Sequence, residues 1–359
     1  MPRVLVIDDS PSVRRALTTN LHGVQGISVV GAAGSAEEAQ RLLAELNPDV
    51  LTLDMAMPGM SGIEFLTWLT PRSNIPAIVL SAVTPADGRL ALKGLDIGAA
   101  AVISKPGPGR PMPDVMQDLI RAIRDAGRSR ILNGAVRSRP PVVQPAAVAP
   151  PSVMNAANPG AVRRHIIALG ASTGGTKAIE AALQPLPQWT PGIVIVQHMP
   201  AGFTATFAER LNTICQIRVR EARDGDAVEQ GVALVAPGGY HMSIVRAGRG
   251  YAVSVHDGER VHHQRPAVDV LFNSVAKLAG PDAVGVLLTG MGSDGADGMK
   301  AMRMAGAHTI AEDESTCVVF GMPGAAIRVG AAMEVVPLPR VPNAMLNAVT
   351  GKVAVGGVR

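Results

Sequence analysis

Residues 165–176, HIIALGASTGGT, join an apolar run to a turn of small residues and then to a helical segment. This succession is typical of a buried parallel strand followed by a helix that covers the sheet. In open parallel sheets, ligands bind at the edge where the strands end. The segment therefore predicts an α/β fold and places Ser172 at the edge of the sheet where a functional site is expected.

Ser172 suits two kinds of site. Gly170, Ser172 and Gly174 satisfy G-x-S-x-G, the strand-turn-helix pattern that exposes a nucleophilic serine. The turn also resembles a glycine-rich phosphate loop, although it has Ser172 where the dinucleotide motif has glycine, and it lacks the Gly-Lys-Ser/Thr of the P-loop. The pattern favours a nucleophile and leaves a nucleotide-binding output domain as the alternative.

The rest of the C-terminal half repeats the alternation of strands and helices. Apolar runs recur at 192–198, 231–239, 283–290 and 307–313. Residues 241–258 differ, because they read as two alternating strands around a turn at 247–250, which predicts a β-hairpin. We therefore expect a doubly wound, mainly parallel α/β domain with one antiparallel hairpin.

Two further strand ends carry the partners that a serine nucleophile needs. His198 follows GIVIVQ, and Asp294 lies in the turn GMGSDG after AVGVLLT. Either residue alone would more often be structural, since Asp294 could cap the next helix. Their convergence with Ser172 at one sheet edge predicts a Ser/His/Asp site. The chain order Ser, His, Asp differs from that of α/β-hydrolases and argues against that fold.

Other polar residues are expected nearby. We expect His241, His256, His262 and His263 on the substrate side, with Arg265 and Pro266 at the start of the helix that follows. From loop position, the backbone N–H groups of Thr173 and Met291 are candidates for an oxyanion hole.

The N-terminal half predicts five parallel βα units, with strands at 4–8, 27–31, 49–54, 77–81 and 100–104. Asp8, Asp9 and Asp54 follow or end two of these strands, and such converging carboxylates suit Mg²⁺. Ser81 and Lys105, at two other strand ends, would hold an anion beside them. We therefore expect Asp54 to attack a phosphoryl donor and Ser81 and Lys105 to bind the phosphoryl group.

These residues, with MPGMSG at 57–62 and Pro106 after Lys105, resemble the receiver domain of response regulators. The resemblance implies a flavodoxin-like (βα)5 fold and phosphorylation of Asp54 by a histidine kinase, with Mg²⁺ held by Asp8, Asp9 and Asp54. Val102 stands where many receivers carry a switching aromatic residue, and Ala56 where glutamate is frequent.

The second half resembles the catalytic domain of chemotaxis protein-glutamate methylesterases, the CheB type. The similar stretches include GASTGGTKAIE, IVIVQHMPAGF, RPAVDVLFNSVA, LLTGMGSDGADGM and DESTCVVFGMPGAAI. The resemblance implies that Ser172 is the nucleophile, His198 the base and Asp294 the group that orients it. It also implies glutamate γ-methyl esters and glutamines of chemoreceptors as substrates, a CheA-type kinase as phosphodonor, and no cofactor for hydrolysis. Glu312, where glutamine is usual, is expected to affect only peripheral contacts.

Length and composition set the remaining expectations. The 359 residues suggest two domains, here a receiver at 1–126, a Pro/Ala-rich linker at 127–162, a catalytic domain at 163–350 and a tail at 351–359. No apolar run is long enough to cross a membrane and no signal peptide begins the chain, so we expect a cytoplasmic monomer without membrane insertion. Arginines gather between 121 and 139, but without a recognition helix, which argues against nucleic acid as a partner.

Overall fold

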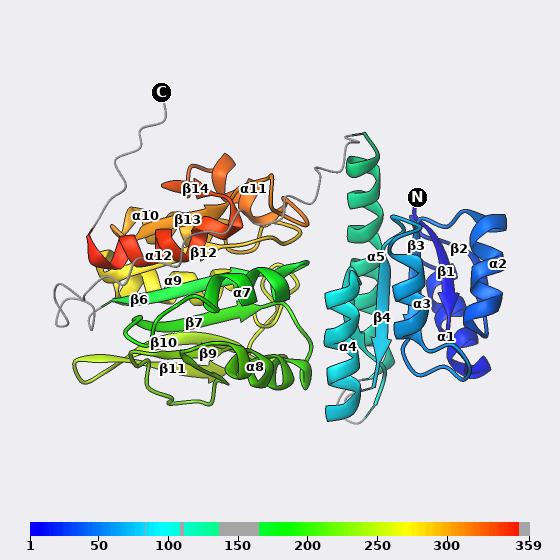
Figure 1. The fold of residues 1–359 in the computed structure, drawn as a ribbon, viewed down its shortest axis with the longest axis horizontal. Helices are drawn as coiled ribbons and strands as arrows, with labels where there is room; N and C mark the ends of the chain where they lie inside the picture. Colours follow the sequence, from blue (N-terminus) through cyan, green and yellow to red (C-terminus); the bar gives the residue numbers. More distant parts are fainter. Residues whose placement is uncertain (83, 108–110, 136–164, 352–359) are drawn as a thin grey trace. The chain divides into compact units, whose positions relative to one another are not determined.

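The computed structural model describes residues 1–82, 84–107, 111–135 and 165–351 (Figure 1). The chain divides into two compact units, Met1–Val142 and Val143–Arg359. Each unit has its own parallel sheet and its own core of buried aliphatic side chains. Among the described residues, no helix is both long and apolar enough to span a bilayer.

The first unit has a five-stranded parallel sheet in the order β2-β1-β3-β4-β5. Its strands are β1 (Arg3–Ile7), β2 (Ser28–Ala33), β3 (Val50–Asp54), β4 (Ala77–Ser81) and β5 (Ala101–Ser104). Its helices are α1 (Pro11–His22), α2 (Ala36–Leu46), α3 (Gly62–Leu69), α4 (Pro85–Ile97) and α5 (Met112–Ala135). The order confirms the predicted (βα)5 fold, and the strand order reverses direction between β1 and β3.

Local sequence fixes where these helices begin. The side chains of Ser10, Ser35, Ser61 and Thr84 each accept a hydrogen bond from a backbone N–H of the first turn that follows. Helices α1 and α3 therefore begin soon after β1 and β3 end. The residues at these strand ends, Asp8 and Asp54, lie at the edge of the sheet where the chain turns into the helices.

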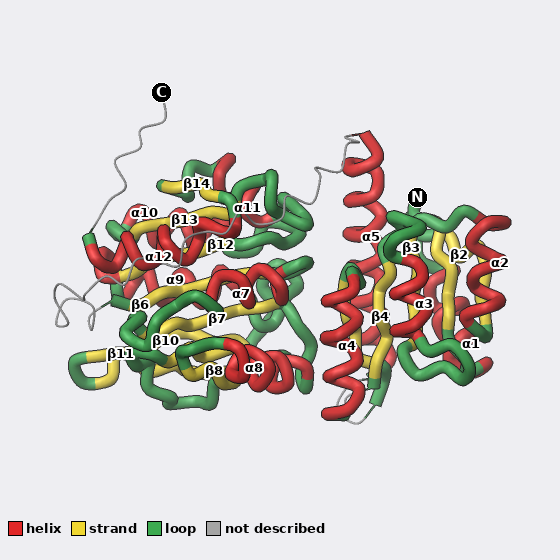
Figure 2. The backbone as a smooth tube through the Cα atoms, in the orientation of Figure 1, coloured by secondary structure: helices red, strands yellow, loops and turns green. Residues whose placement is uncertain are grey.

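The second unit has a seven-stranded parallel sheet in the order β14-β13-β12-β6-β7-β9-β8 (Figure 2). Its strands are β6 (Ile166–Ala171), β7 (Gly192–Gln197), β8 (Arg218–Glu221), β9 (Val232–Val235), β12 (Ala283–Leu287), β13 (His308–Glu312) and β14 (Glu334–Val336). Its α-helices are α7 (Gly175–Leu183), α8 (Phe203–Ile214), α9 (Val268–Leu278), α10 (Ala296–Met304), α11 (Met322–Arg328) and α12 (Val341–Thr350). The order reverses at β6, so the crevice beyond β12, β6 and β7 is where such folds bind ligands.

The predicted hairpin is confirmed. Strands β10 (His241–Ala247) and β11 (Gly250–His256) pair antiparallel in a two-stranded sheet of their own. Gly248, in the turn, has φ +57°, a conformation that glycine adopts without strain. The hairpin packs on α9, where the Ile244 N–H donates to Ser274 Oγ at 3.0 Å.

Three details differ from the sequence analysis. Strands β8 and β14, which form the two edges of the large sheet, were not anticipated, because one is rich in charged residues and the other is very short. Helix α5 continues to Ala135, past the expected receiver boundary at 126. Most of the expected linker and nearly all of the tail lie outside the described residues, and the domain ranges stay a prediction.

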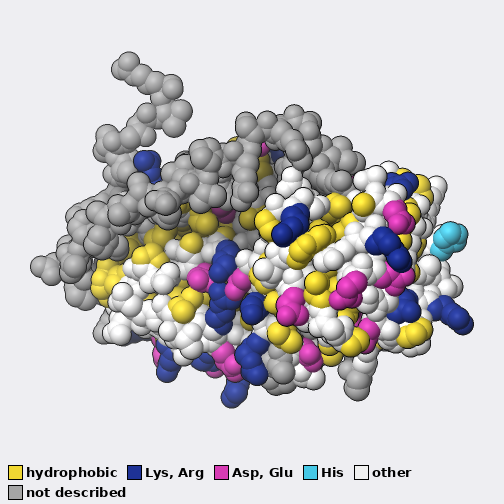
Figure 3. All heavy atoms as spheres, turned by 45° about the vertical axis from the view of Figure 1, so that its right-hand side comes forward, with side chains coloured by type: hydrophobic (Ala, Val, Ile, Leu, Met, Phe, Trp, Pro, Cys, Tyr) yellow, Lys and Arg dark blue, Asp and Glu magenta, His cyan; other side chains and the backbone are white. Residues whose placement is uncertain are grey.

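The basic stretch on α5 is partly engaged within its own unit. Arg121 lies 3.5 Å from a carboxylate oxygen of Asp118, and Arg124 donates to the Gln25 carbonyl at 3.1 Å. On the face drawn in Figure 3, basic and acidic side chains are intermixed across the described surface.

Candidate active site

The ends of β6 and β7 bring Ser172 and His198 side by side. Ala171 and Gln197, the last residues of the two strands, are paired in register. The His198 N–H donates to the Ala171 carbonyl at 3.1 Å, and the Ser172 N–H donates to the Thr289 carbonyl at 3.0 Å. The loop after β12 is therefore hydrogen-bonded to the serine turn, as the predicted convergence of strand ends requires.

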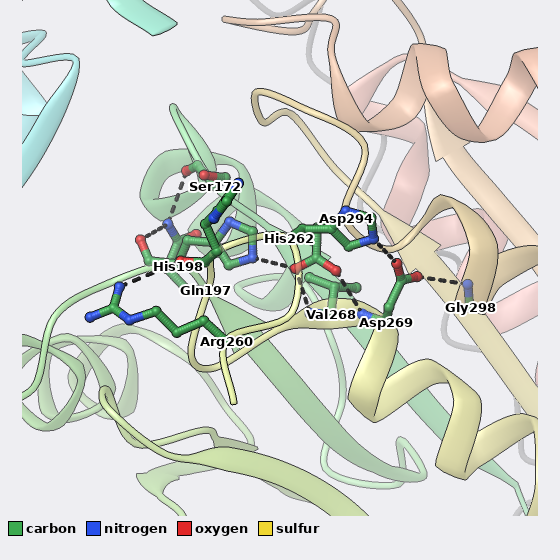
Figure 4. A network of polar contacts seen from close by, with 10 residues as sticks. Ser172, Gln197, His198, Arg260, His262, Val268, Asp269, Asp294 and Gly298 are labelled. Atoms are coloured by element: carbon green, nitrogen blue, oxygen red, sulfur yellow. Dashed lines mark hydrogen bonds and ion pairs between the residues drawn. The ribbon is translucent and has the colours of Figure 1, made fainter. Parts of the chain in front are cut away.

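His198 and Asp294 form a buried pair. His198 Nε2 lies 2.7 Å from Asp294 Oδ2, and the two side chains are 5% and 2% exposed. His198 Nδ1 is also buried and has no hydrogen-bond partner among the described residues. Ser172 lies on the side of His198 away from Asp294 (Figure 4). If Nε2 donates to the carboxylate, Nδ1 carries the free lone pair that a base needs.

Asp294 also caps helix α9. Its Oδ2 accepts a hydrogen bond from the Val268 N–H at 2.8 Å, and its Oδ1 accepts one from the Asp269 N–H at 2.9 Å. Burial raises the pKa of Asp294, but the hydrogen bonds and charge of His198 and these two N–H groups lower it by more, so the net shift is downward. The carboxylate is thus held ionised beside the imidazole.

The two oxyanion candidates lie on the loops that flank Ser172. Within the described part of the chain, neither the Thr173 N–H nor the Met291 N–H donates to another group. A Cβ atom added to Gly290 would lie 2.8 Å from Ser172 Cβ, so the loop that carries Met291 is packed directly against the serine. Both residues thus lie on loops next to Ser172, and the role of their N–H groups in an oxyanion hole stays a prediction.

This close approach predicts the effect of Gly290→Ala. The added methyl group would overlap Ser172 Cβ and the Met322 sulfur, and it would push the two loops apart. Because small displacements of reacting groups can cost about 100-fold in rate, we expect kcat for ester hydrolysis to fall by about that factor. Gly250→Ala is the control, since its Cβ would meet no atom closer than 3.9 Å. Equal kcat values for the two variants would contradict the prediction.

Glu312 lies closer to the site than the sequence suggested. Its side chain is fully buried, and Oε2 accepts a hydrogen bond from the Thr289 N–H at 2.8 Å. The carbonyl of that same Thr289 accepts the Ser172 N–H. Glu312 therefore lies nearer to Ser172 than expected, because Thr289 alone separates the two residues, and its effect on the reaction stays a prediction.

Glu312→Gln tests the cost of this buried acid. Burial raises the pKa of Glu312 above 4.5, and the Thr289 N–H only partly offsets this. A raised pKa means that the native state loses stability as pH rises from the unfolded pKa toward the folded one. We expect the variant to have a higher melting temperature than the wild type at pH 7, and this difference should vanish below about pH 4.5. Each kcal/mol of unfolding free energy corresponds to roughly 2–4 °C. A lower melting temperature at pH 7 would contradict this.

The other histidines differ in burial and in their partners, and their expected place on the substrate side stays a prediction. His241 is 2% exposed, and its Nε2 lies 2.8 Å from the Glu259 carbonyl. Burial lowers the pKa of His241, which favours a neutral ring. His262 is paired with Asp269, whereas His256 is exposed near the carbonyl of Asp257. Arg265 forms an ion pair with Asp257 at the loop before α9.

The first unit assembles the expected acidic pocket at the ends of β1 and β3. Lys105 Nζ lies 3.0 Å from Asp8 Oδ2 and 2.7 Å from Asp54 Oδ2. Burial raises the pKa of Asp8, and the charge of Lys105 only partly offsets it. Burial lowers the pKa of Lys105, but its bonds to Asp54 and Asp8 raise it by more. Ser81, 2% exposed, ends the neighbouring strand β4.

Two groups of side chains have the composition of metal ligands. Asp8, Asp9 and Asp54 each offer a carboxylate oxygen, and His262, Asp269 and Asp297 form a second group. In each group the ligand atoms all lie within 4.8 Å of one another. An all-carboxylate set fits a hard cation that prefers oxygen ligands.

Comparison with known proteins agrees with both halves of this description. Residues 167–345 match the family model "CheB methylesterase", and residues 4–116 match "Response regulator receiver domain". A relative from Syntrophus aciditrophicus, "Protein-glutamate methylesterase/protein-glutamine glutaminase 2", is 45% identical, with 97% of this chain and 99% of the relative covered. A Salmonella choleraesuis relative, "Protein-glutamate methylesterase/protein-glutamine glutaminase", is 44% identical over 98% of both chains.

A solved structure agrees as well. The "CheB methylesterase catalytic domain" of Thermotoga maritima is 36% identical and has a TM-score of 0.50, and the match covers 51% of this chain and 97% of that one. These matches favour the esterase interpretation of the GASTGG turn over a nucleotide-binding domain. With a receiver domain in front of its second unit, the chain belongs to the CheB methylesterase family.

Proposed function

We propose that this chain is a phosphorylation-regulated protein-glutamate methylesterase that hydrolyses glutamate γ-methyl esters of chemoreceptors and deamidates receptor glutamines. The observation that carries the proposal is the buried pair of His198 and Asp294, 2.7 Å apart, next to Ser172 at the topological switch point. The names of relatives that match nearly the whole chain support the same activity.

In this mechanism His198 Nδ1 takes the proton of Ser172 Oγ as the hydroxyl attacks the ester carbonyl. A bond forms between Oγ and the carbonyl carbon, and the tetrahedral intermediate then expels methoxide, which leaves as methanol with the proton from His198. Water attacks the acyl-enzyme by the same steps, and the products are a receptor carboxylate and free Ser172. For a glutamine substrate the leaving group is ammonia.

Asp294 and two backbone groups assist these steps. The ionised carboxylate fixes the ring through Nε2 and stabilises the imidazolium as it forms. In the best-known Ser/His/Asp sites, Nδ1 faces the acid and Nε2 serves the serine. The proposed mechanism uses the two nitrogens of His198 the other way round. The N–H groups of Thr173 and Met291 stabilise the oxyanion, and loss of one such donor elsewhere costs about 2.7–4 kcal/mol of barrier.

The receiver domain supplies the regulation. Asp54 is the phosphorylated residue, Ser81 and Lys105 bind the phosphoryl group, and Asp8, Asp9 and Asp54 hold Mg²⁺. An ion held by these three carboxylates would supply positive charge beside the phosphoryl oxygens. The phosphodonor in the cell is a histidine kinase of the CheA type, and the protein acts as a cytoplasmic monomer on methylated chemoreceptors. The domain ranges given by the sequence, 1–126 and 163–350, correspond to these two roles.

A methanol-release assay on methylated receptor fragments tests the function and its control together. A small-molecule phosphodonor with Mg²⁺ should raise the rate of the wild-type protein by at least about tenfold. Such a rise corresponds to a shift of about 1.4 kcal/mol in the equilibrium between a less active and a more active state. Asp54→Asn should keep the basal rate and lose the rise. Removing Mg²⁺ with a chelator should have the same effect. No methanol from the wild type under any condition would refute the proposed activity.

A further inference from the structure

A second histidine–aspartate pair lies directly behind the first. His262 Nε2 is 2.9 Å from Asp269 Oδ2, and the Asp269 side chain is 6% exposed. His262 itself is 38% exposed. The mechanism above uses neither side chain, although the two pairs stand in a row (Figure 4).

Backbone hydrogen bonds join the two pairs. The Asp269 N–H donates to Asp294 Oδ1 at 2.9 Å. Asp269 therefore contacts His262 through its side chain and Asp294 through its backbone. Asp269 Oδ1 in turn accepts the Gly298 N–H at 2.7 Å. Asp269 therefore ties the first turn of α9 to the first turn of α10, and Asp294 lies in the loop just before α10.

Helices α9 and α10 approach each other closely at Gly298. A Cβ atom added to Gly298 would lie 2.7 Å from Phe272 Cβ and 2.9 Å from Asp269 Oδ1. In such a packed junction, we expect a rotation of the Asp269 side chain to shift the first turn of α9 and the loop that carries Asp294. The orientation of Asp269 is therefore an element of the active-site geometry.

His262 and the Gly298 N–H together fix this orientation, one at each oxygen of the carboxylate. Burial raises the pKa of Asp269, and the nearby charge of Asp294 adds to this, whereas the Gly298 N–H and His262 lower it. Without His262, Asp269 Oδ2 would have no protein donor among the described residues. His262 also has φ +49°, a backbone conformation uncommon outside glycine, so the loop holds it in place at some conformational cost.

We propose that His262 is a positioning residue for the esterase reaction. Through its hydrogen bond to Asp269 it fixes the first turn of α9, and thereby the orientation of Asp294 and His198. The proposal rests on the proposed function, because it assigns His262 to the reaction carried out by that site.

Two other acidic groups lie beside the pair: Asp294, whose charge acts on Asp269, and Asp297. Asp297 matters most for the test, since its carboxylate completes the second group of metal-type ligands. All assays are therefore run with and without a chelator, on unphosphorylated protein, so that receiver Mg²⁺ has no influence.

The kinetic test compares three variants of the full chain. His262→Ala should lower kcat for methanol release by about tenfold or more, with KM within about twofold of the wild type, because the substrate contacts are intact and the base is misplaced. His262→Gln, whose amide can still donate to Asp269, should recover most of kcat. His308→Ala, the matched control, removes the pair of His308 with Glu334 at the start of β13 and should behave as the wild type.

Several outcomes would overturn the proposal. Wild-type kcat in His262→Ala would remove the role, and equal losses in the alanine and glutamine variants would show that the hydrogen bond is not what matters. A raised KM with unchanged kcat would make His262 a substrate contact. A change on adding the chelator would mean that His262, Asp269 and Asp297 hold a metal ion instead.

A second measurement needs no substrate. In the Ser172→Ala protein, the proton between His198 Nε2 and Asp294 should give a low-field NMR resonance. We expect His262→Ala to shift or broaden this resonance and His262→Gln to leave it in place. An unchanged resonance in both would refute the positioning role even if the enzyme is active, whereas absent methanol release with the expected NMR shift would refute only the proposed function.

Discussion

Ser172→Ala is expected to reduce methanol release from methylated receptor fragments by about 10⁴-fold or more, to the level left by binding and the oxyanion donors alone. The reason is that the hydroxyl provides the only covalent bond to the acyl group in the proposed mechanism. The fold should be unaffected, since the contacts of Ser172 with Thr289, Gly175 and Gln197 use its backbone. Melting temperature and methanol release are the two measurements.

The control is a serine on a different element of the same unit. Ser254→Ala, in the middle of β11, should keep full activity. A fluorophosphonate probe should label the wild type and Ser254→Ala and should leave Ser172→Ala unlabelled. Substantial turnover by Ser172→Ala would mean that water, activated by His198, attacks the ester directly.

Asp294→Asn is expected to lower kcat by about 10³–10⁴-fold, since the comparable change in a Ser/His/Asp protease costs about 10⁴. The amide would present a donor or a weaker acceptor to His198 Nε2 and so favour the wrong tautomer. KM should change little, because Asp294 is 2% exposed and touches no substrate. Steady-state kinetics with a receptor fragment separate the two constants.

Asp294→Asn should also change the dependence of stability on pH. The pKa of Asp294 is below its ordinary value in the native protein, so its ionised form stabilises the fold above about pH 3.8, and this contribution is lost as pH falls through the lower native pKa. The variant should therefore melt lower than the wild type at pH 7. A kcat within tenfold of the wild type would show that Asp294 is only a helix cap.

Much of this site could be predicted from strand ends. In a parallel sheet, chain order and apolar runs suffice to place Ser172, His198 and Asp294 at one edge, and Asp8 and Asp54 at another. The nitrogen of His198 that faces Asp294 could not be predicted, because it depends on the ring's rotation. The edge strand β8 was not predicted because it is rich in charged residues, which a sheet edge tolerates, and β14 was not predicted because it has only three residues.

Contacts made by backbone groups could not be predicted from the sequence either. Nothing in the sequence shows that Asp269 offers its N–H to Asp294, because the contact depends on how the first turn of α9 meets the loop after β12. The proximity of Glu312 to Ser172 arises in the same way, through both backbone groups of Thr289. These residues can be found only when the packing of neighbouring elements is known.

The hairpin β10–β11 pairs with no strand of the large sheet, and its turn lies at the end away from the chain segments that enter and leave it. Gly248 and Arg249 of the turn are exposed, which makes the tip an attachment point for protein engineering. A fluorophore or a short affinity tag inserted between Gly248 and Arg249 would extend into solvent and leave the register of β6, β7 and β12 undisturbed. The enzyme can thus be tethered to a surface or followed by fluorescence while its chemistry is measured.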